Sequence, residues 1–260
     1  MTFPQELQAA RLRLLKNRPY LASAAWALRP VAKTGLGTLA VDKYWRIYYD
    51  PDSLSDWPVE AIEGVLYHEI CHLLRNHAER MQDCEPQLSN IATDAEINDD
   101  LVRERVNFPT PPITPGSIGL PDNLLAEEYY AELEKRLQSP AGSSATGAKP
   151  DSTNESKRQS GEDLAQPDNG QGKSKQDRDE QRQSEQGQGK KANGDFESWE
   201  QEQMGKPRPG SGHCGSCATG QKAPWEEDAP TARSTDGLSP IQAELIRREV
   251  AKQIKEYAQS

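Results

Sequence analysis

The sequence predicts an α+β fold in which helices pack around a small antiparallel sheet. Three observations support this class. Two β-rich runs lie close together in the first third of the chain, and apolar residues recur at helical spacing in several segments. Large apolar residues almost vanish between Ser139 and Asp195. We therefore expect a domain over residues 1–136, a linker over 137–210 and a C-terminal segment over 211–260.

The first predicted elements are a helix over residues 5–16 and a β-hairpin. The stretch that begins YLASAAWAL fits either a helix or a buried strand, because periodicity does not decide between them. The runs 38–41 (TLAV) and 44–49 (YWRIYY) are separated by only two residues and predict the antiparallel hairpin.

Three helices are predicted after the hairpin. Residues 59–81 read as one long helix, because Pro58 suits a helix start and an apolar stripe follows it. Further helices are expected over 88–106 and 123–138, with an ordered Pro-rich loop over 108–122 between them.

The rest of the chain divides into a polar linker and a short tail. Leu164 is the only large apolar residue of 139–195, so burial there cannot offset chain entropy and we expect disorder. The tail regains structure-forming composition but is too small to form a core alone. It must pack on the first domain, on a partner, or on sequence outside this chain.

Composition also narrows the class of protein. The net charge of −10 argues against a general nucleic-acid binder. No run of 18 apolar residues predicts a membrane span, and the N-terminus does not resemble a secretory signal. The four cysteines are too scattered for a disulfide framework. We expect a cytoplasmic protein.

The stretch YHEICHLLRNH, residues 67–77, holds three of the four histidines. His68 and His72 are four residues apart, so on a helix both imidazoles share one face, about 40° apart. This spacing suits one tetrahedral Zn²⁺. Glu69 can reach a water at the open coordination position and act as general base. An accidental pair of histidines is the alternative, but the apolar flanks and the preceding strand favour a zincin-like metallopeptidase site.

The third protein ligand is predicted on the next helix. If the first helix continues, His77 lies about 140° from His72 and faces away from the site, and no glycine breaks the helix before it. We expect His77 at the helix surface or behind the ligands. Asp94 is the better candidate, because a carboxylate on an apolar helix face is costly unless it is paired or binds a metal.

The polar residues near Asp94 in the sequence are predicted to have roles other than metal binding. We expect Asn98, one turn further on, to hydrogen-bond behind the ligands. Glu96, Asp99 and Asp100 are expected to be solvated. Three side chains could stabilise an oxyanion, with packing favoured for the two tyrosines: Arg80, Tyr129 and Tyr130.

The tail contains a second motif, H-C-x-x-C, formed by His213, Cys214 and Cys217. These residues could bind zinc, but a structural site needs four ligands and a fourth is not evident. A loop with incidental cysteines is the favoured interpretation. Cys71 is expected to be a buried small side chain.

Three segments together resemble a known family: TLAVDKYWRIYYDP, VLYHEICHLLRNHAER and NIATDAEINDDL. They are similar to the metallopeptidase domain of bacterial and phage proteins that carry a von Willebrand A-like domain C-terminally. The resemblance covers residues 18–135, and HCGSCATG resembles the segment that follows the linker in such proteins. It implies a zincin-like fold, peptide hydrolysis and a MoxR-type AAA ATPase partner. Residues 218–260 are too few for a von Willebrand A-like domain, so a shortened member or a fragment is expected.

These observations predict a zinc metallopeptidase that hydrolyses peptide bonds. His68, His72 and Asp94 would hold Zn²⁺, and Glu69 would be the general base. The alternative is a zinc-stabilised, inactive scaffold that docks a partner, such as an AAA ATPase, through its linker and tail. Both hypotheses require zinc, but only the first requires Glu69.

Overall fold

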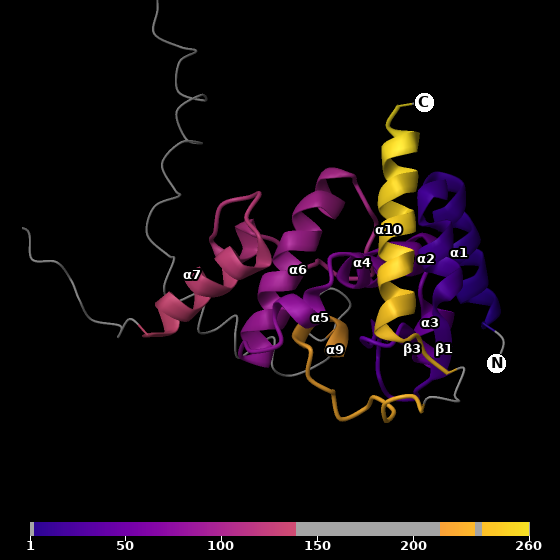
Figure 1. Ribbon diagram of the computed structural model, residues 1–260, viewed down its shortest axis with the longest axis horizontal. Coiled ribbons are helices and arrows are strands. Elements are labelled where there is room, and N and C mark those ends of the chain that lie inside the picture. The colour runs from indigo at the N-terminus through magenta and orange to yellow at the C-terminus, as the bar shows by residue number, and fades with distance from the viewer. Residues whose placement is uncertain (1–2, 139–213, 232–235, 260) are drawn as a thin grey trace, which may run out of the picture. The chain divides into compact units, whose positions relative to one another are not determined.

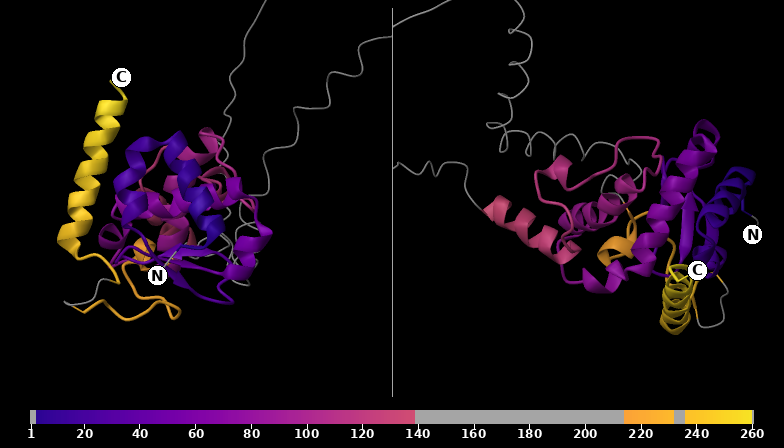
Figure 2. Two further views of the ribbon diagram at one scale, coloured as in Figure 1. Left: turned by 90° about the vertical axis from the view of Figure 1, so that its right-hand side faces the viewer. Right: turned by 90° about the horizontal axis from the view of Figure 1, so that it is seen from above.

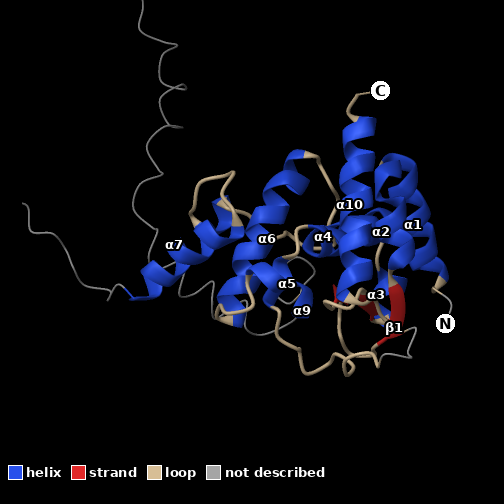
Figure 3. Cartoon of the chain, in the orientation of Figure 1, coloured by secondary structure: helices blue, strands red, loops and turns tan. Residues whose placement is uncertain are grey.

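The structure is a computed structural model that describes residues 3–138, 214–231 and 236–259. In the described part of the chain, helices dominate and three short strands complete an α+β fold (Figure 3). Almost all of the predicted linker, and His213, lie outside the described residues. No helix among the described residues is long and apolar enough to cross a membrane.

The sheet contains β1 (Arg29–Ala32), β2 (Leu39–Val41) and β3 (Arg46–Tyr49) in the order β1-β3-β2. The predicted hairpin is confirmed, since β2 and β3 are antiparallel. The prediction of a purely antiparallel sheet is wrong, because β1 pairs with β3 in parallel. This strand comes from the stretch that periodicity left undecided. Its Pro30 cannot donate to a ladder, which is consistent with a place at the sheet edge.

The N-terminal helices precede the sheet. They are α1 (Gln5–Asn17), the 3₁₀ turn η1 (Pro19–Leu21) and α2 (Ala22–Ala27). α1 packs along α4 (Val59–Leu74), the helix that carries the H-E-x-x-H motif, and α3 (Pro51–Asp56) lies between the sheet and α4 in sequence. Leu7, Leu14 and Val65 are fully buried members of the core that these elements share.

The helix predicted over 59–81 is in fact two helices. α4 ends at Leu74 and α5 (His77–Arg80) begins after Asn76, whose φ of 54° is left-handed. Asparagine adopts this conformation more readily than other residues with a side chain. The chain therefore turns before His77 without a glycine, which the prediction had not allowed for.

The later helices are α6 (Pro86–Arg103), the 3₁₀ turn η2 (Gly116–Ile118) and α7 (Ala126–Gln138). α6 packs on α4 and on α7 (Figure 1). A second apolar cluster joins α6 and α7 and includes Ile91 and Tyr129. Because α6 lies between the two apolar clusters, most of it is buried.

The C-terminal segment packs on the N-terminal part, the first of the three alternatives considered for the tail. α9 (Ser216–Thr219) contacts α4, α5 and α6, and α10 (Pro240–Tyr257) packs against η1 and α2 (Figures 1 and 2). Cys217, Ala218 and Val250 are buried in the main core. Residues from both ends of the sequence thus complete one core.

Gly64 provides a test of how closely α4 packs. A β-carbon at this position would collide with the carbonyl oxygen of Asn107. Alanine favours a helix by about 1 kcal/mol over glycine, but the collision involves backbone atoms that cannot move easily. We expect Gly64→Ala to lower the free energy of unfolding by about 1–3 kcal/mol in a denaturant titration.

Gly116→Ala is the matched control, because a β-carbon there meets no atom within 4 Å. If both variants had the unfolding free energy of the unsubstituted chain, the close approach of α4 to residues 106–107 would be wrong.

Candidate metal centre

Four buried side chains bring potential metal ligands together. They come from α4, from α6 and from the residue two positions before α9: His68, His72, Asp94 and Cys214. One ligand atom from each lies within 4.8 Å of all the others. The two histidine Nε2 atoms are 3.0 Å apart, and Asp94 Oδ1 lies 3.4 Å from the first and 3.2 Å from the second.

Cys214 completes this cluster from a distant part of the sequence. Its Sγ lies 3.5 Å from His68 Nε2 and 3.5 Å from Asp94 Oδ1. Sequence reasoning grouped Cys214 with His213 and Cys217 and favoured an incidental cysteine. The structure instead places it 146 residues along the chain from its histidine neighbour, a proximity that no local spacing could reveal.

Asn98 orients the first histidine. Its Nδ2 donates to the carbonyl oxygen of Ile113 at 2.8 Å, so its Oδ1 faces His68 Nδ1 at 2.9 Å. An acceptor there selects the tautomer whose proton is on Nδ1. The lone pair of His68 Nε2 is then directed into the cluster. Asn98 thus makes the hydrogen bond behind a candidate ligand that was expected of it from the sequence.

A chain of contacts supports the second histidine. His72 Nδ1 lies 3.0 Å from His77 Nδ1, and His77 Nε2 lies 3.3 Å from Glu96 Oε2. If His72 Nδ1 donates and His77 Nδ1 accepts, the His72 Nε2 lone pair is free for a metal. His77 is fully buried, so its expected position on the helix surface is wrong, whereas a position behind the ligands agrees with the structure.

Glu96 is part of this support and is not solvated as expected. It is 8% exposed and its carboxylate accepts hydrogen bonds from Arg75, Arg80 and the backbone N–H of Ala126. Burial would raise its pKa, but His77 and Arg80 hold that pKa well below its usual range. An ionised Glu96 therefore lies behind the histidine pair. This role of Glu96 was not predicted from the sequence, because its partners come from α5 and from the residue that follows α4.

Glu69 lies beside the four ligands. Its side chain is buried, and Oε1 is 3.8 Å from Cys214 Sγ. Its Oε2 has no hydrogen-bond partner among the described residues. Burial raises the pKa of Glu69 to about 8, partly opposed by His68. A carboxyl group in such surroundings is typical of a residue that exchanges protons near neutral pH.

The protonation states of the cluster decide whether it can take a cation. Burial would lower the pKa of His68, but Asp94 raises it above its usual value, so a cation would displace a proton from this imidazole. Burial lowers the pKa of His72 to about 3, so this imidazole is neutral and keeps a lone pair. Burial would raise the pKa of Asp94, but His68 and His72 hold it well below its usual range. An anionic carboxylate and a neutral imidazole are the protonation states in which these side chains bind metals.

The three oxyanion candidates are engaged elsewhere. The Tyr129 hydroxyl donates to the carbonyl oxygen of Pro121, and the Tyr130 hydroxyl accepts from the backbone N–H of Glu85. Arg80 pairs with Glu96 and Glu127. The packing role favoured for the tyrosines agrees with these contacts.

Three other predicted side chains can be placed. Cys71 is buried, as expected. Asp99 accepts from Arg103 at 2.7 Å, and Asp100 accepts from Arg75 at 2.6 Å. Both aspartates are only partly exposed, so they are ion-paired rather than simply solvated.

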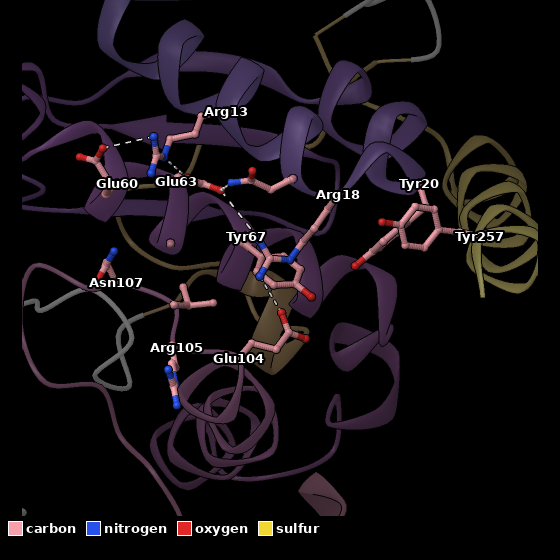
Figure 4. A pocket seen from close by; sticks show the side chains of 13 residues that line it. Arg13, Arg18, Tyr20, Glu60, Glu63, Tyr67, Glu104, Arg105, Asn107 and Tyr257 are labelled. Carbon is pink, nitrogen blue, oxygen red and sulfur yellow. Dashed lines mark hydrogen bonds and ion pairs between the residues drawn. The ribbon is translucent and has the colours of Figure 1, made fainter. Parts of the chain in front are cut away.

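A separate cavity of about 460 Å³ opens beside the N-terminal half of α4 (Figure 4). Its walls carry ion pairs, with Arg13 2.6 Å from Glu63 and Arg18 2.6 Å from Glu104. None of the four potential metal ligands lines it. This cavity is therefore distinct from the candidate centre.

The donor set fits a zinc ion. Two imidazoles, a carboxylate and a thiol are all ligand types that Zn²⁺ accepts, and four of them match its usual coordination number. The supporting hydrogen bonds from Asn98 and His77 are those that metal-binding histidines commonly make. Softer thiolate and imidazole donors also argue against Mg²⁺ or Ca²⁺, which prefer oxygen.

The fold and the site define an α+β domain with a candidate metal centre on an H-E-x-x-H helix. The chain belongs to the family described as "Putative metallopeptidase domain", which matches residues 2–260. No curated protein and no solved structure gives a significant match.

Proposed function

We propose that this chain is a zinc-dependent metallopeptidase. The observation that carries the proposal is the convergence of His68, His72 and Asp94 on one buried point, with Glu69 beside it. The family to which the chain belongs supports a hydrolase of this class. The three candidate ligands belong to two helices that pack on one another, which supports the proposal.

Each residue has a defined task in this proposal. His68, His72 and Asp94 would hold Zn²⁺, which would supply Lewis acidity toward a peptide carbonyl and a water. Glu69 would take a proton from the attacking water and pass it to the leaving amine. Asn98 and His77 would keep the imidazole rings in the metal-binding orientation.

A second function is supported by Cys214. Structural zinc sites have four protein ligands, whereas catalytic sites keep one position open. The chain offers four donors, which fits a zinc-stabilised scaffold without peptidase activity. This alternative assigns no function to Glu69. The Glu69 side chain is buried, and its Oε2 has no hydrogen-bond partner among the described residues.

The decisive experiment combines metal analysis with a peptide-cleavage assay on the purified full chain. We expect about one zinc per chain and cleavage of a mixed peptide library that stops when a chelator removes the metal and resumes when zinc is returned. A chain that contains no zinc contradicts both functions. Zinc without cleavage, in the chain and in its Cys214→Ala variant, supports the scaffold.

A further inference from the structure

We propose that the Cys214 thiolate is the fourth ligand of the centre and closes it against the water that hydrolysis requires. The chain in this conformation is then a latent peptidase, which becomes active when the segment that carries Cys214 withdraws. The inference about latency rests on the proposed function, whereas the inference about the ligand does not.

The position of the sulfur is the first argument. Cys214 Sγ contacts His68 Nε2 and Asp94 Oδ1 at 3.5 Å each and also lies 3.8 Å from Glu69 Oε1. A water held by zinc and deprotonated by Glu69 would have to lie between these same groups, within hydrogen-bond reach of the carboxylate. The thiol occupies that place, so a water and Cys214 exclude one another.

The backbone around Cys214 is held in place by the sheet. A β-carbon at Gly215 would collide with the carbonyl oxygen of Val41, so only glycine lets this segment lie so close to β2. Ser216 Oγ accepts from the backbone N–H of Lys43 at 3.0 Å, and the Ser216 N–H donates to Glu226. These contacts make the placement of the thiol a built feature of the fold.

The same contacts place the segment beside a sheet edge. β2 is one of the two outer strands in the order β1-β3-β2, and Gly215 and Ser216 lie close to Val41 and Lys43. An extended peptide binds to a domain by adding to such an edge strand. The segment that supplies the thiol therefore also occupies a place where a substrate could align.

Glu69 distinguishes a latent centre from a permanent structural one. A buried polar oxygen without a hydrogen bond destabilises the folded chain, and Glu69 Oε2 has no hydrogen-bond partner among the described residues. In a permanently closed structural site, Glu69 has no function that would explain this destabilisation. If the Cys214 segment withdraws, the same carboxylate faces the water that it would activate.

The bond changes on metal binding are simple. The Cys214 thiol releases its proton to solvent as the sulfur binds the cation, with no change of oxidation state. No oxidant or reductant is needed. On withdrawal of the segment the sulfur leaves the cation and takes up a proton from solvent.

Cobalt substitution tests the ligand directly. Cobalt(II) can replace zinc in the purified full chain, and a cysteine thiolate bound to cobalt gives an intense charge-transfer band in the near ultraviolet that nitrogen and oxygen ligands do not give. We expect this band in the unsubstituted chain and its loss in Cys214→Ala. Cys217→Ala and Cys71→Ala are matched controls, because both remove a buried thiol outside the four-ligand cluster, and both should keep the band.

Peptide cleavage by the same zinc-loaded variants tests latency. We expect Cys214→Ala to retain zinc and to cut a mixed peptide library at least about tenfold faster than the unsubstituted chain, because a minor open conformation is populated to about 10% or less. Circular dichroism and thermal unfolding verify that the variant is folded.

The outcomes separate the two parts of the inference. A charge-transfer band that persists in Cys214→Ala overturns the ligand. Loss of the band with cleavage at the unsubstituted rate overturns latency and leaves the proposed peptidase standing. Loss of the band with no cleavage by either chain supports the ligand but overturns latency together with the proposed function.

Discussion

Asp94→Ala should weaken zinc binding by more than about 100-fold, the upper range for loss of a residue that only supports a metal ligand. Asp94 supplies the one carboxylate of the cluster, and its Oδ1 lies within 3.4 Å of both histidine Nε2 atoms. Without it, the remaining donors are two imidazoles and one thiol. Zinc affinity is measured by competition with a chromophoric chelator at fixed pH.

Asp99→Ala is the matched control for this prediction. Asp99 is on the same helix, but its carboxylate pairs with Arg103 and lies outside the ligand cluster. We expect its zinc affinity to stay within about twofold of the unsubstituted chain, since ion pairs near the surface contribute little. Equal affinities in both aspartate variants would remove Asp94 from the site.

Thermal unfolding is a second measurement of zinc binding by Asp94→Ala. A metal that binds only the folded chain stabilises it in proportion to its affinity, so zinc should raise the Tm of the unsubstituted chain more than that of Asp94→Ala. The comparison is made as a difference with and without zinc, because the substitution also alters contacts in the metal-free protein.

Local patterns in the sequence predicted most of the helices and three of the four side chains that gather at the candidate metal centre. The spacing of His68 and His72 depends only on helix geometry, which is the same in every α-helix. Asp94 was found because an ionisable group on an apolar face demands a partner. Both arguments need the identity of neighbouring residues and nothing about the rest of the fold.

The break before His77 shows where local reasoning failed. The prediction treated glycine as the residue needed to end the helix, but Asn76 adopts the left-handed conformation instead. This one dihedral angle turns His77 inward, where its Nδ1 reaches His72. The conformation of Asn76 therefore decides between the two positions expected for His77, and it selects the one behind the ligands.

Glu96 and Cys214 were missed for a different reason. Their partners come from elements that are distant in sequence: Glu96 meets α5 and the start of α7, and Cys214 meets α4 and α6. Contacts of this kind depend on tertiary packing, which composition and periodicity do not encode. The H-C-x-x-C motif marked Cys214 as a possible zinc ligand, but nothing in it pointed to α4 or α6. Gly215, which permits close approach to a strand, was a second local signal.

The parallel strand β1 also depended on tertiary structure. Its residues are compatible with helix or strand. Its pairing with β3 arises because the chain skips one strand position between β1 and β2, and β3 then fills that position. The neighbouring hairpin needed no such information, because two β-rich runs joined by a short turn pair with each other.

Glu69→Gln should abolish most peptide hydrolysis while leaving zinc bound. Glutamine has nearly the same size and shape, but it cannot take a proton from the attacking water. General acid–base groups contribute about 10²–10⁴-fold to rate, so we expect kcat to fall by about 10³-fold. Glu69 is outside the four-ligand cluster, and zinc content should therefore equal that of the unsubstituted chain.

The substitution is made both in the unsubstituted chain and together with Cys214→Ala, in which the proposed fourth ligand is absent. The larger loss of rate is expected in the second case, because only an open centre gives Glu69 a water to activate. Glu60→Gln is the control: Glu60 lies on the same helix, but its side chain is 39% exposed and pairs with Arg13. Hydrolysis that survives Glu69→Gln in both backgrounds, with zinc bound, would mean that another group accepts the proton. Burial destabilises the ionised form of Glu69 and raises its pKa to about 8. In that case no catalytic role would explain why an ionisable side chain is buried here.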